Sequence, residues 1–137
     1  MQTQIPGNCG NSPRSLLAIE IAVNLASNKY DKLEPLLAGD FTLIIVGDGE
    51  EIARSELQSY MEKAIQSQIS IEKFDILTSI SHGKYAAVSS RAHMSNGVTL
   101  NSHDLYEFTS AGSSAKLLMV TSYVVDSAHS HASNTKS

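Results

Sequence analysis

The sequence is poor in cysteine and in basic residues, and it has no long hydrophobic run. Its one cysteine, Cys9, cannot form an internal disulfide and has no evident activating partner, which fits a reducing compartment and no cysteine nucleophile. Acidic residues number 14 against 10 basic ones, so the chain lacks the basic surface of a nucleic-acid-binding protein. No apolar run approaches the roughly 20 residues that span a bilayer. Residues 1–14 have neither the charged start nor the apolar centre of a signal peptide. We therefore expect a cytoplasmic protein without nucleic-acid or membrane partners.

What is present fits one globular domain. The 137 residues are 42% hydrophobic and 18% charged, which is enough to bury a sizeable core. Residues 1–11 are polar with Gly and Pro, and residues 127–137 have almost nothing to bury, so both ends are expected to be mobile. The domain is therefore expected over residues 12–126. His129 and His131 have no further ligand nearby, so neither a metal nor a cofactor is predicted.

Two helices are expected in the first third of the chain. Ser12 can cap a helix whose first residue is Pro13, and the apolar run LLAIEIAVNLA carries it to about Asn28. This helix is apolar nearly all round, so it is expected to be buried on most sides. A shorter helix over YDKLEPLLA stops at Gly39, and the β-branched run FTLIIV at 41–46 is typical of a buried strand.

A third helix follows the turn GDGEE. Its sequence, SELQSYMEKAIQSQ, begins with Ser55 and Gln58 at the spacing of a capping box. One stripe of this helix carries Leu57, Tyr60, Met61, Ala64 and Ile65. Four strands are then expected at 69–80, 84–95, 98–109 and 115–126, and their short connections favour antiparallel pairing. Helices grouped before the sheet indicate an α+β fold in which the helices cover one face of a curved sheet.

The Asn96-Gly97 pair predicts how two of these strands align. A two-residue type I′ turn sets Ser95 opposite Val98. The pairs on one face are then His93 with Leu100, Arg91 with Ser102, Ser89 with Asp104, Ala87 with Tyr106 and Tyr85 with Phe108. The other, outer face carries Ala86, Val88, Ala92 and Met94 against Asn101, His103, Leu105 and Glu107. A three-residue loop would swap these partners.

Asp104 is unusual in this pattern. It is expected on the same face as Leu100, Tyr106 and Phe108, where a bare carboxylate is costly. Either burial keeps the carboxyl protonated and raises its pKa, or Arg91, diagonally across the strand pair, keeps it ionised and lowers its pKa. The two-residue turn favours the pair with Arg91. Such a pair can be purely structural or can bind a ligand.

The order of elements and several motifs resemble one known family. The elements are a long helix, a short helix ending in LLAGDFTLIIVGDG, the segment ARSELQSYM, a strand with HDLYEF and a last strand TSYVVD. These elements and their order are similar to those of the nuclear transport factor 2-like (NTF2-like) superfamily, in particular its SnoaL-like members. The resemblance covers about residues 12–126. It implies a cone of three helices on a strongly curved, mostly antiparallel sheet, a deep pocket between them, and a homodimer through the outer sheet face. CGNSPR and YEFTSAG are closer still to small bacterial members without assigned activity.

Two enzyme groups of this superfamily can be compared residue by residue. Its ketosteroid isomerases use an aspartate base, a tyrosine on the first helix and a protonated aspartate on a strand. Alignment without gaps puts Ile45 at the base and Ile21 at the tyrosine, whereas Asp104 matches the protonated aspartate. Isoleucine can neither take a proton nor donate a hydrogen bond, so that route is close to excluded. The epoxide hydrolases, which place an arginine between acids, resemble the chain through Arg91 and Asp104, although no second acid is evident.

Three functions remain open from the sequence. The first is a binding module for a small apolar or amphipathic molecule, with Arg91, His93 and Asp104 as its polar groups. Its expected pocket residues are Ile21, Ile45, Tyr60, Tyr85, Ser89, Tyr106 and Phe108. The second is an isomerase, cyclase or epoxide-hydrolase-like enzyme in which Asp104, with Arg91 or His93, is the acid or base. The third is a dimerisation or adaptor domain without a ligand. Binding is favoured, because no replacement for the missing base emerges.

Overall fold

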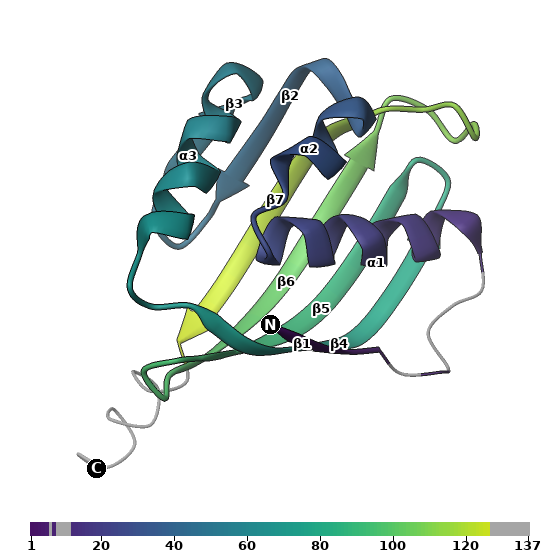
Figure 1. Cartoon of the computed structure of the whole chain (residues 1–137). Coiled ribbons are helices and arrows are strands. Elements are labelled where there is room, and N and C mark those ends of the chain that lie inside the picture. Colours follow the sequence, from purple (N-terminus) through teal and green to yellow (C-terminus); the bar gives the residue numbers. More distant parts are fainter. Residues whose placement is uncertain (6, 8–11, 127–137) are drawn as a thin grey trace.

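The computed structural model describes residues 1–5, 7 and 12–126 (Figure 1). One seven-stranded sheet has the strand order β1-β4-β5-β6-β7-β2-β3, and the helices lie on one face of it, called the inner face below. The helices are α1 (Pro13–Ala26), α2 (Tyr30–Leu33) and α3 (Arg54–Gln66), with a short 3-10 helix η1 (Glu34–Leu36). The strands are β1 (Gln2–Gln4), β2 (Leu37–Ile45), β3 (Glu50–Ala53), β4 (Ile71–His82), β5 (Tyr85–Met94), β6 (Thr99–Phe108) and β7 (Leu117–Asp126). The predictions for Cys9, His129, His131 and residues 127–137 fall outside the described residues.

The α+β class is confirmed, with two differences from the expected arrangement. The helices are not all placed before the sheet, because β2 and β3 precede α3 in the chain. The sheet is mixed, since β1 pairs parallel with β4 and β2 pairs parallel with β7, while the other neighbours are antiparallel. In the part of the chain that the structure describes, no helix is long and apolar enough to cross a membrane.

Helix α1 begins as the sequence predicts. Ser12 Oγ accepts a hydrogen bond from the Ser15 backbone N–H at 3.1 Å, and Pro13 takes the first helical position, where no backbone donor is needed. The helix ends at Ala26, close to the predicted end. It is less buried than expected, because Leu16 is 53% exposed and the helix packs on the sheet mainly through β4 and β5.

Three residues of the N-terminal segment 1–11, which was expected to be mobile, belong to the sheet. Gln2–Gln4 form β1 and pair with Lys73–Asp75 of β4. A mobile end was expected because this segment has few apolar side chains to bury. An edge strand, however, is held by backbone hydrogen bonds, which a polar sequence supplies as well as an apolar one.

The chain between α1 and α3 forms more strand than expected. Helix α2 ends at Leu33, because Pro35 has no N–H for a helical hydrogen bond. Strand β2 then begins at Leu37 instead of residue 41, and the unpredicted β3 pairs with its second half. This extra hairpin widens the sheet beyond β7.

Helix α3 begins at Arg54, directly after β3, and not at Ser55 as predicted. Glu56 Oε1 accepts a hydrogen bond from the Ala53 backbone N–H at 3.2 Å, so Glu56 closes the first turn in place of the predicted Ser55 and Gln58 pair. Arg54 Nη1 donates to the backbone oxygens of Leu37 and Ala38, each at 3.2 Å. These contacts fix the start of α3 against the start of β2.

The loop between β5 and β6 differs from the predicted two-residue turn, and that part of the prediction is wrong. The Met94 backbone N–H donates to Val98 O at 2.8 Å, so three residues lie between the paired positions. Gly97 has φ 88°, the left-handed conformation that closes a three-residue hairpin loop with a bulge. Asn96 Oδ1 supports this loop by accepting from the Val98 N–H at 3.1 Å.

This one-residue shift turns all of β5 over relative to β6. Val88 now pairs with Asp104, and Arg91 pairs with Asn101. Four β5 residues predicted for the outer face therefore lie on the inner face, namely Ala86, Val88, Ala92 and Met94. Burial of Val88, which is 1% exposed, is favoured by the shifted alignment and would be lost in the predicted one.

Candidate ligand-binding site

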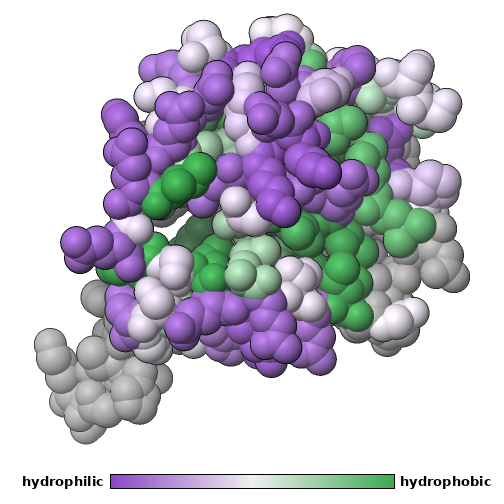
Figure 2. All heavy atoms as spheres, in the orientation of Figure 1, coloured by the Kyte–Doolittle hydropathy of each residue, from purple (hydrophilic) through white to green (hydrophobic). Residues whose placement is uncertain are grey.

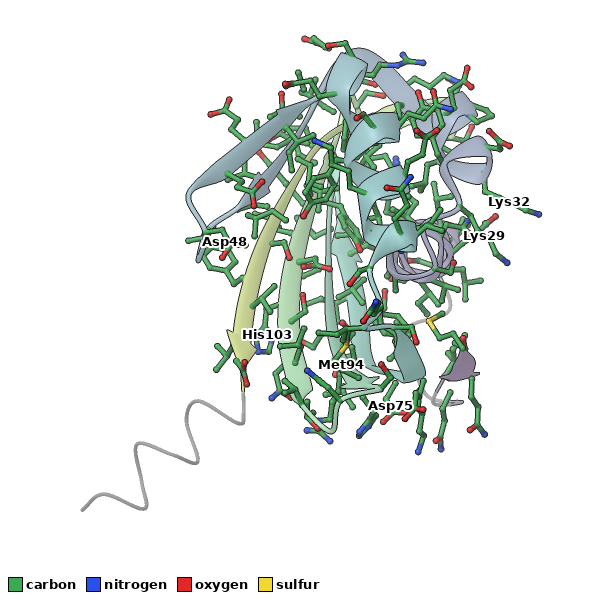
Figure 3. The ribbon with its side chains drawn as sticks, turned by 60° about the vertical axis from the view of Figure 1, so that its left-hand side comes forward. Lys29, Lys32, Asp48, Asp75, Met94 and His103 are labelled. Atoms are coloured by element: carbon green, nitrogen blue, oxygen red, sulfur yellow. The ribbon has the colours of Figure 1, made fainter. Side chains whose placement is uncertain are left out.

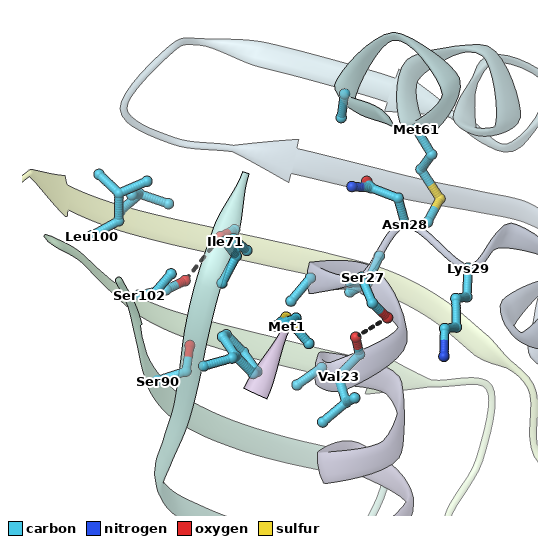
Figure 4. A pocket seen from close by; sticks show the side chains of 18 of the residues that line it. Met1, Val23, Ser27, Asn28, Lys29, Met61, Ile71, Ser90, Leu100 and Ser102 are labelled. Atoms are coloured by element: carbon cyan, nitrogen blue, oxygen red, sulfur yellow. Dashed lines mark hydrogen bonds between the residues drawn. The ribbon is translucent and has the colours of Figure 1, made fainter. Parts of the chain in front are cut away.

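A cavity of about 960 Å³ lies between α1, α3 and the inner face of the sheet, with Met1 among its lining residues (Figure 4). In the space-filling view, a hollow opens between hydrophobic side chains on this side of the molecule (Figure 2). Its apolar lining includes Ala22, Val23, Leu25, Ala26, Leu43, Ile45, Leu57, Met61, Ile71, Phe74, Ala92, Met94, Leu100, Val120 and Val124. Walls of this kind favour the apolar body of a ligand over water.

A polar cluster around Asp104 interrupts the apolar lining on β5, β6 and β7. Asp104 Oδ1 accepts hydrogen bonds from Ser122 Oγ at 2.6 Å and from Ser102 Oγ at 2.8 Å. Ser90, opposite Ser102 on β5, lines the same cavity. Neither serine donates to the second carboxylate oxygen, Asp104 Oδ2. The cluster therefore presents an unused acceptor beside the cavity.

Burial is the main influence on the protonation of Asp104. It raises the pKa of the carboxyl above its ordinary value, and the hydrogen bonds from Ser122 and Ser102 lower the pKa by less. His103 and the Tyr106 hydroxyl also lower the pKa. Arg91 does not act on it, so the predicted pair with a lowered pKa is wrong. The burial of Asp104 favours the alternative considered from the sequence, a carboxyl with a raised pKa.

Tyr106 follows Asp104 on the same face of β6 but is 0% exposed and does not line the cavity. Its hydroxyl makes no well-aligned hydrogen bond to a described residue, but it lies close enough to Asp104 for the two groups to influence each other's pKa. Burial, and then the charge of Asp104, raises the pKa of Tyr106 well above its ordinary range. Tyr106 therefore stays protonated and acts on Asp104 as a buried dipole beneath the cavity wall.

Tyr60 on α3 and Ile45 on β2 line the cavity, as predicted from the sequence. Burial raises the pKa of the Tyr60 hydroxyl, and the charges of Glu50 and Asp48 raise it further. Both acids flank the turn between β2 and β3, on the α3 side of the cavity. Burial and the two acids therefore all disfavour the ionised form of the Tyr60 hydroxyl.

Arg91 and His93 lie on the outer face, so the structure does not bring them to Asp104. Arg91 Nε donates to Asn101 Oδ1 at 3.0 Å. His93 Nε2 is 3.0 Å from Asp75 Oδ2. Both side chains thus contact their own neighbours across the sheet, and neither is among the cavity-lining residues.

The other predicted pocket residues are also elsewhere. Ser89 Oγ is hydrogen-bonded to His103 Nδ1 at 2.9 Å on the outer face, where Figure 3 labels His103 on the side away from the helices. Tyr85, at the end of β5, is 42% exposed on the same face. Ile21 and Phe108 are buried in the core, at 0% and 1% exposure.

Sequence reasoning missed the inner-face role of Ser90 and Ser122. A signal for Ser122 was present, because it stands between Val120 and Val124 at the alternate positions of one strand, where an apolar residue is expected. Ser90 holds the equivalent place between Val88 and Ala92. Polar residues at apolar positions of adjacent strands point to a shared polar site.

The sequence matches no protein-family model and no curated protein. Solved structures do match the fold. A candidate SnoaL-like polyketide cyclase from Shewanella denitrificans OS-217 has a TM-score of 0.67 at 12% identity, covering 83% of this chain and 92% of that one. The epoxide hydrolase/cyclase-like enzyme SalBIII, which has a role in pyran ring formation in the polyether salinomycin, has a TM-score of 0.63 at 17% identity, over 82% and 90%. A candidate ketosteroid isomerase from Kribbella flavida DSM 17836 has a TM-score of 0.61 at 17% identity, over 81% and 76%. The chain therefore has the NTF2-like fold, the fold that it shares with SnoaL-like and ketosteroid-isomerase-like proteins.

Proposed function

We propose that the protein binds a small, mostly apolar molecule in the cavity between the helices and the inner sheet face. The observation that carries this proposal is the cavity itself, about 960 Å³ in volume, with apolar walls and one convergent polar cluster at Asp104. Ligand sites commonly have volumes of roughly 300–1,000 Å³ and this combination of lining residues. An adaptor domain would not need such a cavity, so the third function open from the sequence is disfavoured.

We expect an apolar fluorescent probe, N-phenylnaphthylamine, to bind with a Kd on the order of 1–10 μM. The substitution Ala92→Leu should weaken this binding at least about tenfold, because Ala92 lines the cavity and a larger side chain would fill part of it. Ala87→Leu is the matched control, since it makes the same change on the same strand but toward the outer face. Fluorescence titration measures both. Equal effects of the two substitutions, or no saturable binding, would argue against the cavity as the site.

Acid or base catalysis by Asp104 is the second candidate function. Its support is the combination of a raised pKa and a free Oδ2 beside an apolar cavity, which suits proton transfer to a bound molecule. The fold neighbours described as cyclases, an isomerase and an epoxide hydrolase/cyclase-like enzyme are consistent with it. Arg91 and His93 cannot assist from the outer face, and Ile45 stands where an isomerase base would be. Binding is therefore preferred.

We also infer a homodimer through the outer sheet face, now with a corrected set of residues. The exposed apolar side chains there include Ile80, Tyr85, Leu105, Tyr123 and Val125. Ile80 and Leu105 both flank Ala87 on neighbouring strands, so the apolar surface is continuous across the centre of the sheet. A second copy of the chain would cover a surface that otherwise favours non-specific association.

Leu105→Glu combined with Tyr123→Glu is expected to give a monomer. Leu105 is 44% and Tyr123 51% exposed, so two carboxylates are tolerated in the free chain but not between two apposed sheets. Light scattering of the purified protein gives the mass directly. Leu16→Glu, on the exposed side of α1, is the control and should leave the mass unchanged. A dimer that persists in the double variant would remove this face from the interface.

A further inference from the structure

We propose that the ligand carries a protonated amine on an apolar body, and that this amine binds Asp104 Oδ2. This inference rests on the proposed binding function and names the chemical class of its ligand. It follows from which hydrogen-bonding groups of the cavity are already used, which remain free, and which charges surround them.

The hydroxyl hydrogens of the two serines beside Asp104 are already used. Each serine hydroxyl has one hydrogen, and those of Ser102 and Ser122 both point to Asp104 Oδ1. The two hydroxyl oxygens lie 3.4 Å apart, with no hydrogen left to bridge them. What they and Asp104 present to the cavity is therefore a set of acceptor lone pairs. A ligand group that donates hydrogen bonds fits this set, and a carbonyl or carboxylate oxygen does not.

The charges around the cavity also favour a ligand with an amine. Lys29 is the one lysine or arginine among the described residues that line the cavity, and its side chain is exposed at the end of α1. The hydrogen bonds from Ser102 and Ser122 stabilise the carboxylate form of Asp104. Glu50 and Asp48 add negative charge near Tyr60. An ammonium group on an apolar body would pair with the carboxylate form of Asp104 and donate to its free oxygen, while Lys29 lies on the exposed part of the lining.

Ligand pairs that differ in one group test the proposal. Dehydroabietylamine, dehydroabietinol and dehydroabietic acid share one tricyclic skeleton, and adamantylamine, adamantanol and adamantanecarboxylic acid share a smaller one. By calorimetry at pH 7, at least one skeleton should bind, with the amine about tenfold or more tighter than the alcohol and the acid weakest. Asp104→Asn should abolish the preference for the amine while the alcohol still binds, because the asparagine keeps the shape of the side chain but not its charge.

Asp75→Asn is the control for general attraction between a cationic ligand and an acidic protein. It removes the same charge from the outer face, away from the cavity, and should leave the amine preference intact. An alcohol that binds as tightly as its amine would overturn the amine proposal while the binding function stands. So would an amine preference that survives Asp104→Asn or that disappears with Asp75→Asn. Failure of all six compounds to bind would overturn the binding function and the amine proposal together.

Discussion

Replacing Val88 with aspartate is expected to lower the free energy of unfolding by more than about 4 kcal/mol, the range reached when an unpaired charge is buried in a core. Val88 is 1% exposed and packs in the main apolar cluster beneath the helices. Asp104, directly opposite on β6, would repel the new carboxylate. Urea denaturation at pH 7 measures the loss.

Ser89→Asp is the matched control for this prediction. Ser89 is the next residue along β5 but faces outward, where its hydroxyl is hydrogen-bonded to His103. An aspartate there stays out of the core and lies beside His103, so the loss of stability should be much smaller than at Val88. The two-residue turn expected from the sequence would reverse the order, with Ser89 inside and Val88 outside. A larger loss at Ser89 than at Val88 would therefore reject the alignment of β5 and β6 described above.

Removing both hydroxyls around Asp104, by Ser102→Ala and Ser122→Ala, is expected to cost about 2–4 kcal/mol of stability at pH 7. A hydrogen bond to a charged group contributes roughly 1.5–3 kcal/mol, and water entering the cavity replaces part of the two that are lost. Thermal or urea denaturation of the double variant and the wild type gives the difference. A loss that is absent at pH 7 would mean that Asp104 does not depend on these serines.

The dependence of this loss on pH follows from the pKa of Asp104. In the wild type burial raises that pKa above its ordinary value of 3.8, so the stabilising contribution of the protonated carboxyl is complete below 3.8 and is lost as pH rises through the folded pKa. The serine hydroxyls lower the folded pKa, and their removal raises it further. The cost of the double substitution should therefore be small in acid, where both proteins hold Asp104 protonated, and should grow as pH rises.

Asp104→Asn separates the charge from the shape of this side chain. Because burial penalises the carboxylate, the asparagine variant should be more stable than the wild type at pH 7 by roughly 0.5–2 kcal/mol, the range of typical stabilising substitutions. In that background the two serine substitutions should cost less than in the wild type, and their cost should not vary with pH. An equal cost in both backgrounds would contradict a role for the serines in holding the charge.

Local sequence signals predicted the start of α1 well but did not predict the alignment of β5 with β6. Ser12 and Pro13 mark the start of α1 by their own chemistry, so the prediction needed no partner. The sequence Asn96-Gly97 is compatible with a two-residue or a three-residue loop, because glycine supplies the positive φ that either requires. Only packing of β5 against the helices decides between them, and that contact is remote in sequence.

In the candidate site, too, local features were predicted and features that depend on strand alignment were not. Asp104 was correctly placed on the apolar face of β6, because alternation along a single strand is a local property. The neighbours of Asp104 lie on β5 and β7, so predicting them required the alignment of β6 with both strands. The shift of one residue between β5 and β6 puts Ser90 and Ala92 on the inner face, where Arg91 was predicted. Tyr60 and Ile45 line the cavity, and their positions were inferred from helix periodicity and from the family alignment, neither of which uses the β5–β6 loop.

The short strands at the two edges of the sheet bear on aggregation. A free edge offers unpaired backbone groups that can template addition of another chain. Here one edge is the three-residue β1 and the other is the four-residue β3, so neither gives a second molecule a long ladder to extend. β1 covers Lys73–Asp75 of the twelve-residue β4, and an irregularity between Ile76 and Thr78 interrupts regular pairing farther along that strand. The polar segment Gln2–Gln4 thus helps to keep a sheet with an apolar outer face from growing into a fibril.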